Sequence, residues 1–257
     1  MATPGLGWVP RGAWLAPGYA EWAPPAVLRE MVACLWVAVV PGDADRKALV
    51  LPDACSDLIW QQGAGAHVAG PDTGPVTTIT PAGTVMVGVR FRPAAGGPAL
   101  GVPLSELRDL RVDLAELLPA AARALPATLD PGIAAERALD VAGLLVADGV
   151  LDPAVSQAAA LLGDPAARVE QVADEVGLSM RQLRRRFHAA TGYGPKTLQR
   201  VCRFQRFVRE LDAAGRSCDL ALAAAEAGYA DQSHLTRDCV ELSGLTPAAL
   251  ACLRGPS

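Results

Sequence analysis

Ala173-Asp-Glu-Val-Gly177-Leu-Ser179-Met-Arg-Gln-Leu183 is one stretch of this 257-residue chain, and Ala224-Ala-Glu-Ala-Gly228-Tyr-Ala-Asp-Gln-Ser-His-Leu235 repeats its pattern. In each copy an alanine stands four residues before a glycine, and a polar residue that can cap a helix follows. The small alanine allows two helices to cross closely, and the glycine permits the left-handed turn between them. The pattern therefore predicts two helix-turn-helix units.

The second helix of each predicted unit ends near a glycine, in Thr191-Gly192-Tyr-Gly194-Pro195 and in Ser243-Gly244-Leu-Thr246-Pro247. Proline is favoured in the first turn of a helix, so we expect a linking helix from Lys196 to Leu211. A helix-turn-helix unit places the first polar turns of its second helix in the major groove of DNA. Two units about one helical repeat apart could enter successive grooves on one face of the duplex.

Charge is unevenly distributed along the chain. The formal net charge is −4, which weakly opposes DNA binding. Residues 1–163 hold 10 Lys and Arg against 16 Asp and Glu, whereas residues 164–257 hold 13 against 11. Within the second part, residues 176–209 contain nine basic residues and no acidic one. DNA responds to this local field more than to the total charge, so the distribution favours a nucleic-acid partner.

The segment from Arg168 to Arg254 resembles the DNA-binding domain of the arabinose-regulator (AraC/XylS) family. The resemblance rests on three strings, Val-Ala-Asp-Glu-Val-Gly-Leu-Ser-Met-Arg-Gln-Leu-Arg-Arg-Arg-Phe, Gly-Tyr-Ala-Asp-Gln-Ser-His-Leu-Thr-Arg and Gly-Leu-Thr-Pro, which occur in order with the linking helix. It implies a transcription regulator that binds double-stranded promoter DNA. It also implies an N-terminal domain that senses a small molecule or mediates dimerisation, with RNA polymerase as a further candidate partner.

The same resemblance implies which residues contact DNA, because the family's base-reading positions fall in the first turns of each recognition helix. Arg181, Arg184 and Arg185 would read the first groove, since arginine can hold guanine with two hydrogen bonds; contact with phosphates alone stays open. Lys196, Arg200 and Arg203 on the linking helix are expected to be solvated or to face phosphates. The full predicted set is Ser179, Arg181, Gln182, Arg184, Arg185, Lys196, Arg200, Gln232, Ser233, His234, Thr236 and Arg237.

The second unit departs from the family pattern. Cys239 stands where the family usually has Phe, and Ala223 stands where it usually has Ile. Its recognition helix also carries three acidic residues, Asp231, Asp238 and Glu241. We therefore expect the first unit, from Ser179 to Thr191, to supply most of the specificity.

The first hundred residues alternate short apolar runs with Pro- and Gly-rich turns, which indicates a β-rich barrel or sandwich. The strands are expected near residues 31–40, 48–51, 57–60, 76–80 and 84–91, and helices from Pro103 to Leu162. The predicted fold class is α+β: a β-rich, cupin-like barrel with following helices, then an all-α double helix-turn-helix domain. The expected domains are residues 1–103, a helical connector at 104–163 that is a candidate for dimerisation, and residues 164–257.

Three strings of the N-terminal part, residues 51–60, 68–71 and 88–93, are similar to an uncharacterised domain often joined to this type of DNA-binding domain. All five tryptophans (Trp8, Trp14, Trp22, Trp36 and Trp60) lie in the first sixty residues. They could line an effector pocket or form an ordinary aromatic core. Asp53 and Asp57 straddle Cys55 and could bind a ligand or cap a turn. The candidate effector residues are Trp36, Asp53, Cys55, Asp57, Trp60 and Arg90.

Other function classes find little support. The six cysteines form no zinc-ligand spacing and His67 stands alone, so we expect no metal or cofactor, although a redox role for a cysteine stays open. A repair-type enzyme with a DNA-targeting module would need a four-cysteine cluster, and residues 1–163 hold only Cys34 and Cys55. No hydrolase, metalloprotease or phosphate-loop motif occurs. The longest apolar run has about ten residues against about twenty for a membrane span, and no signal peptide is evident, so the cytoplasm is expected.

Overall fold

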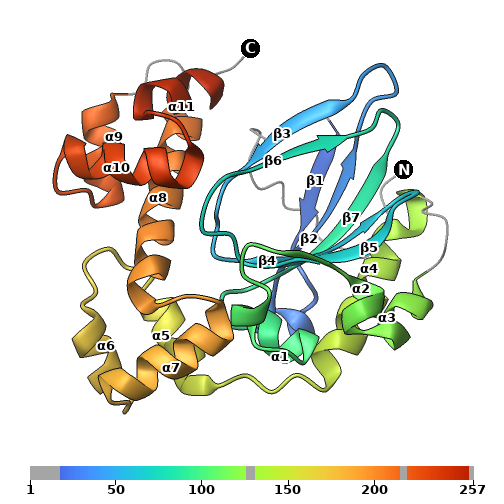
Figure 1. Cartoon of the computed structure of the whole chain (residues 1–257), viewed down its shortest axis with the longest axis horizontal. Helices are drawn as coiled ribbons and strands as arrows, with labels where there is room; N and C mark the ends of the chain where they lie inside the picture. Colours follow the sequence, from blue (N-terminus) through green and yellow to red (C-terminus); the bar gives the residue numbers. More distant parts are fainter. Residues whose placement is uncertain (1–17, 126–130, 215–218, 255–257) are drawn as a thin grey trace.

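The computed structural model describes residues 18–125, 131–214 and 219–254. Trp8, Trp14 and Cys218 lie outside these ranges, so the expectations that concern them are not tested. A β-rich part precedes a helical part, which confirms the predicted α+β class (Figure 1).

The β-rich part contains a six-stranded antiparallel sheet and a separate two-stranded sheet. The large sheet has, in spatial order, β1 (Tyr19–Trp22), β2 (Val32–Val39), β7 (Val85–Phe91), β4 (Ser56–Gln61), β5 (Gly65–Ala69) and β8 (Arg111–Asp113). The two-stranded sheet pairs β3 (Arg46–Val50) with β6 (Val76–Thr80). The pairs β2–β7, β3–β6 and β4–β5 are nested along the chain, as in jelly-roll and cupin folds. The β3–β6 sheet arches over one face of the large sheet, which leaves an incomplete barrel (Figure 1).

The other face of the sheet carries the hydrophobic core of this part. Helix α4 (Pro131–Ala147) packs against β2 and β7, and its Val141 and Ala142 are buried with Leu35 and Val89 of these strands. Short helices complete this part: η1 (Ala26–Leu28), α1 (Gly96–Leu100), η2 (Leu104–Glu106), α2 (Leu114–Leu117) and α3 (Pro119–Ala124).

The predicted connector at 104–163 is not a separate structural unit. Strand β8 joins the sheet and α4 belongs to the core of the β-rich part. Helix α5 (Pro153–Leu161) instead contributes Val155 and Ala158 to the core of the helical part, together with Leu162. The change between the two cores therefore lies between α4 and α5, because each helix buries its apolar face against a different neighbour.

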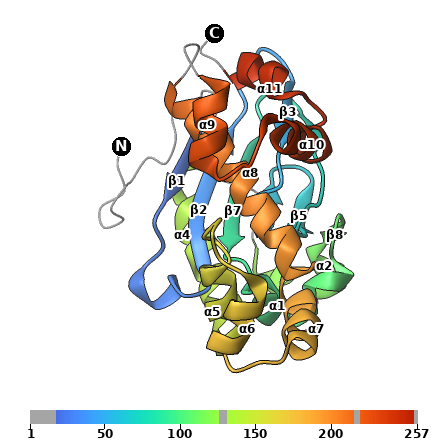
Figure 2. The same ribbon diagram turned by 90° about the vertical axis from the view of Figure 1, so that its left-hand side faces the viewer.

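The helical part places one helix-turn-helix unit at each end of a long helix. Helices α6 (Val169–Glu175) and α7 (Met180–Thr191) form the first unit, and α8 (Pro195–Ala214) links it to α9 (Leu220–Ala227), α10 (Gln232–Ser243) and α11 (Pro247–Arg254). The 20 residues of α8 span about 30 Å. Figure 1 and Figure 2 both show α8 running alongside the β-rich part. The Gln205 side chain of α8 donates a hydrogen bond to the Pro52 carbonyl at 2.6 Å, which ties the two parts together.

Candidate functional site

The two helix-turn-helix units have the same turn geometry. Gly177 and Gly228 both adopt the left-handed conformation, with φ of 68° and 89°. The residue after each glycine donates its backbone N–H to the alanine carbonyl five residues earlier, at 2.9 Å in both units (Leu178 to Ala173, and Tyr229 to Ala224). The repeat detected in the sequence is thus a repeat of hydrogen bonds.

The C-terminal ends of the two recognition helices are also equivalent. Gly192 and Gly244 are left-handed C-caps of α7 and α10. The residue before each glycine has a buried hydroxyl that donates to the backbone one turn earlier, Thr191 to the Phe187 carbonyl and Ser243 to the Cys239 carbonyl. These bonds fix the helix ends, so each recognition helix has a defined direction.

Helix α7 presents a basic face to solvent. Arg181, Arg184, Arg185 and His188 are all exposed and follow the i, i+3, i+4, i+7 spacing of one helix face. With the exposed Lys196 at the start of α8 they line one surface groove. This convergence of cations on one face matches the surface needed to approach a phosphate-rich duplex.

Ser179 and Gln182 start α7 by capping it. The Gln182 backbone N–H donates to the Ser179 hydroxyl, and the Gln182 side chain accepts from the Ser179 backbone N–H at 3.0 Å. This capping box satisfies two N–H groups of the helix end. Both residues were predicted as DNA contacts, and both are also needed to position the helix.

Arg186 has a different role from its three arginine neighbours. Its guanidinium makes a two-pronged ion pair with Asp152, at 2.7 and 2.5 Å. Asp152 is also the N-cap of α5. This ion pair therefore fixes α5 against α7.

Helix α10 exposes Gln232, Ser233, Thr236 and Arg237, in agreement with a reading face at its N-terminal half. His234, which was predicted as a DNA contact, is half-buried and its ring meets the Tyr229 ring edge-on at 5.1 Å between centroids. Its role in the structure is thus packing within the second unit.

Of the three acidic residues of the second recognition helix, Asp231 and Glu241 are exposed and Asp238 is buried. Asp238 is 5% exposed and binds Arg200 of α8 at 2.6 Å, with Arg203 at 3.5 Å. Glu241 also pairs with Arg200, and Asp231 caps the helix through the His234 backbone N–H. All three carboxylates therefore have a partner within the protein, which offsets part of their repulsion of DNA.

The prediction that Arg200 and Arg203 are solvated or face phosphates is wrong, because both guanidinium groups contact side chains of the second unit. Arg200 is occupied by two carboxylates of α10, and the Arg203 guanidinium lies 5.1 Å from the centroid of the Tyr229 ring. Both residues fix α10 against α8. Their partners lie 26 to 41 residues away in the sequence, so no local pattern could reveal them.

A second candidate site lies in the β-rich part. A cavity of ≈ 570 Å³ separates the open face of the large sheet from the β3–β6 sheet. Gln205 and Val208 of α8 and Arg254 of α11 close it on the side of the helical part. A molecule bound here would touch both parts of the chain.

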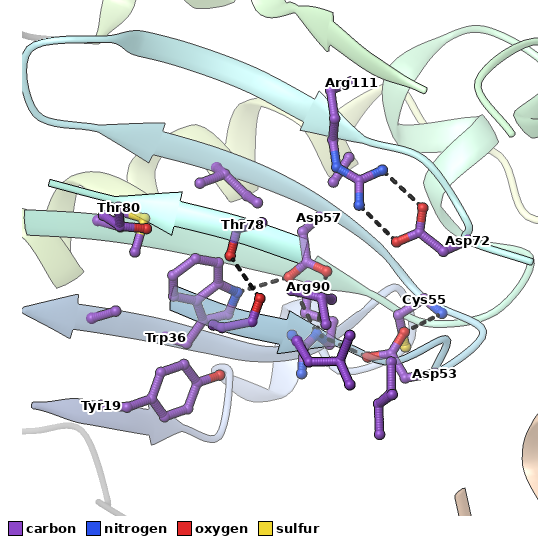
Figure 3. Close-up of a pocket in the computed structure, with 18 of the residues that line it drawn as sticks. Tyr19, Trp36, Asp53, Cys55, Asp57, Asp72, Thr78, Thr80, Arg90 and Arg111 are labelled. Atoms are coloured by element: carbon purple, nitrogen blue, oxygen red, sulfur yellow. Dashed lines mark hydrogen bonds and ion pairs between the residues drawn. The ribbon is translucent and has the colours of Figure 1, made fainter. Parts of the chain in front are cut away.

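Five of the six predicted effector residues line this cavity: Trp36, Asp53, Cys55, Asp57 and Arg90 (Figure 3). Trp60 does not, because side chains alternate along β4 and Trp60 points with Leu58 into the core on the opposite face. Sequence reasoning missed Tyr19, Thr78 and Arg111. Tyr19 and Arg111 lie on strands of four and three residues, which are too short to give a periodic signal.

Arg90 is the centre of the polar end of the cavity. Its Nε lies 3.2 Å from Asp57 Oδ1 and 3.5 Å from Asp53, and its Nη1 lies 3.5 Å from Glu21. Asp57 also accepts a hydrogen bond from the Trp36 indole N–H at 2.7 Å. Burial raises the pKa of Asp57 above its usual range, opposed by the charge of Arg90. Three carboxylates thus surround one guanidinium.

Trp36 lies flat across β7 because residue 88 has no side chain. A Cβ atom at Gly88 would fall 2.0 Å from the Trp36 ring. Tyr19 stacks beside the indole, with ring centroids 5.8 Å apart. The glycine therefore lets the indole reach Asp57 and form an aromatic wall of the cavity.

Two further arginines of the cavity wall are paired with carboxylates, and its histidine is uncharged. Arg111 binds Asp72 through two hydrogen bonds of 2.9 and 2.7 Å, and Arg254 binds Asp212 at 2.6 and 2.7 Å. Burial, followed by the charge of Arg111, lowers the pKa of His67 below 6.5, so the imidazole is neutral at pH 7.

The described cysteines include buried and exposed thiols. Burial raises the pKa of Cys34 and of Cys239 to about 12, which keeps both protonated at neutral pH. Across the described ranges, no three His, Cys, Asp or Glu side chains gather in a way that could hold a metal ion. Nor does any helix in these ranges combine the length and the apolar character that crossing a bilayer requires.

Comparison with known families and structures gives two matches along the chain. Residues 172–251 match a family described as a helix-turn-helix domain, and residues 20–113 match a domain of unknown function. None of the curated proteins matches the chain in sequence.

Among solved structures, ToxT from Vibrio cholerae is similar at 8% identity and a TM-score of 0.45, over 82% of this chain and 99% of that one. A structure of ToxT from Vibrio cholerae O395 is similar at 10% identity and a TM-score of 0.44, over 85% and 92%. The ToxT of strain SCE256, solved with an unsaturated fatty acid bound, gives 11% identity and a TM-score of 0.41, over 86% and 90%. These similarities are too distant to transfer a ligand or a residue's role.

The family matches agree with the two resemblances found in the sequence. Residues 172–251 thus carry an AraC-type helix-turn-helix domain, behind a domain of unknown function at residues 20–113.

Proposed function

We propose that this protein is a one-component, effector-responsive transcription regulator that reads promoter DNA with α7 and α10 in successive major grooves. The observation that carries the DNA-reading part is the exposed face of Arg181, Arg184 and Arg185 on α7. Helix α8, which is about 30 Å long, joins the two units, and one turn of duplex is about 34 Å. The two units can therefore reach grooves on the same side of the DNA.

The first unit is proposed to dominate recognition. Its reading face carries three arginines, whereas that of α10 carries Gln232, Ser233, Thr236 and one arginine, Arg237. Arginine makes the commonest specific contact with guanine. The dominance of the first unit rests on this contrast and not on the acidic residues of α10.

The effector-responsive part of the proposal rests on the segment between β5 and β6. Pro71 lies against Gly192, the C-cap of α7, because a Cβ at Gly192 would fall 2.6 Å from the Pro71 ring. Pro75 lies near Gly244, the C-cap of α10, at 3.8 Å by the same measure. Asp72, between the two prolines, lines the cavity. A ligand that displaces Asp72 would move a segment that reaches both recognition helices.

The DNA-reading part is tested by fluorescence anisotropy with promoter DNA from beside the protein's own coding region and with a shuffled duplex. Arg181→Ala and Arg185→Ala should each weaken specific binding by about 1–3 kcal/mol and reduce discrimination between the duplexes. Arg108→Ala is the matched control, since it removes an exposed arginine of the β-rich part. Unchanged affinity and discrimination in both α7 variants would contradict the assignment.

A contact with phosphate alone has a different signature. Such a contact would weaken both duplexes equally and reduce the slope of binding against salt by about one. A DNA-binding protein whose affinity responds to no ligand would instead be an effector-independent regulator, in which the N-terminal domain mediates dimerisation.

A further inference from the structure

We propose that the cavity beneath the β3–β6 sheet binds an organic ammonium ion, that is, a small molecule with a positively charged amine at one end of an apolar body. This inference rests on the proposed function, in which the cavity is the effector site, and it names the chemistry of the effector. It follows from the charges at one end of the cavity and from the wall between them and the apolar end.

The polar end has three acidic side chains and one cation, Arg90. Glu21, Asp53 and Asp57 all lie within 3.5 Å of Arg90. Asp53 is the most accessible of the three carboxylates, with 33% of its side chain exposed against 9% for Glu21 and 13% for Asp57. A ligand that donates hydrogen bonds and carries positive charge would therefore be favoured beside Asp53.

The other cations of the cavity wall do not offset this end. Arg111 and Arg254 each form a two-pronged pair with a carboxylate of their own. Arg46 pairs through its backbone with Thr80, which lies at the end of the cavity away from Asp53 (Figure 3). The electrostatic character of the Asp53 end is thus set by the three carboxylates and Arg90.

The wall next to these carboxylates is aromatic and then apolar. Trp36 and Tyr19 stack side by side, and tryptophan is the aromatic side chain that attracts cations most strongly. Ala38, Ile59 and Met86 continue this surface as a cluster apart from both main cores. A ligand with a cation at one end and an apolar body would match this wall, which is acidic at Asp53 and apolar at Met86. The cavity volume of ≈ 570 Å³ is typical of a small-molecule site.

The test compares three probes that share one body and differ in the charge of the head group. Isothermal titration calorimetry of the full chain at pH 7 would use 4-phenylbutylamine, 4-phenylbutanol and 5-phenylpentanoate. The amine should bind at least tenfold more tightly than the alcohol, which is about 1.4 kcal/mol, and the carboxylate should bind most weakly. Equal or tighter binding of the alcohol or the carboxylate would overturn the proposal, as would no binding of the amine at millimolar concentration.

A variant assigns the selectivity to Asp53. Asp53→Asn retains the oxygen that accepts from the Cys55 backbone N–H and removes only the charge. It should reduce amine affinity at least tenfold, to that of the alcohol, whereas the exposed Asp140→Asn on α4 should change nothing. Retained amine preference in a folded Asp53→Asn protein would contradict the assignment. The three-probe comparison on the natural chain stands even where that variant fails to fold.

A parallel measurement of DNA affinity separates this proposal from the proposed function. Amine binding that leaves DNA affinity unchanged would contradict the effector-responsive regulator and retain the ligand class. Specific DNA binding by a protein that ignores the amine would contradict the ligand class and retain the DNA-reading assignment.

Discussion

At the scale of single residues, Gly88 determines the shape of the cavity. A Cβ there would meet the Trp36 ring at 2.0 Å, and the neighbouring atom is a rigid indole that cannot yield by a simple rotation. Displacing the ring would also break the 2.7 Å hydrogen bond from Trp36 to Asp57. The sequence offers no sign of this requirement, because glycine in a strand also marks bulges and turns.

Gly88→Ala should therefore lower the free energy of unfolding by roughly 1–3 kcal/mol, as overpacked sites do, and abolish amine binding. Gly143→Ala is the matched control, since a Cβ there meets nothing within 4 Å and alanine favours the helix. Urea unfolding followed by circular dichroism measures both variants. Equal stability of Gly88→Ala and the natural chain, with amine binding intact, would contradict the described position of Trp36.

At the scale of elements, the sequence predicts correctly those features that neighbouring residues decide. The helix ends at Gly192 and Gly244 and the N-caps Ser179 and Asp231 were predictable because capping is decided within a few residues. The strands β1, β5 and β8 were missed because they are short and β5 has only one β-branched residue, Val68. Their pairing across the sheet defines them. Pairing across the sheet also decides which face a side chain takes. The sequence therefore identified Trp36 and Arg90 as candidate ligand residues but did not show that Trp60 faces the core.

The position of α5 gives a prediction about truncation. A fragment of residues 150–257 keeps Asp152 with its partner Arg186, whereas a fragment of residues 164–257 loses α5 and exposes the core that Val155 and Leu162 cover. Each such side chain contributes roughly 1.5–3 kcal/mol on burial. We expect the longer fragment to melt cooperatively and bind DNA, and the shorter one to aggregate or melt far lower. Equal melting temperatures would contradict the assignment of α5 to the helical core.

At the scale of the whole molecule, the chain joins a cavity to two reading helices through one short segment. Pro71 lies against Gly192 and Pro75 lies near Gly244, the equivalent glycines of the two units, and Asp72 between the prolines lines the cavity. This arrangement could not be predicted from sequence, since it brings together residues more than a hundred positions apart. Through this segment, a ligand in the cavity could act on both helix-turn-helix units.

The most direct test of the account is selection of bound duplexes from randomised DNA by the purified full chain. We predict a motif of two half-sites whose centres lie about 10 base pairs apart in the same orientation, because α7 and α10 belong to two equivalent units joined by one long helix. Arg185→Ala should lose the information of one half-site and keep the other. No enriched motif, or a motif that is the same for Arg185→Ala and the natural chain, would contradict recognition by two helices with α7 dominant.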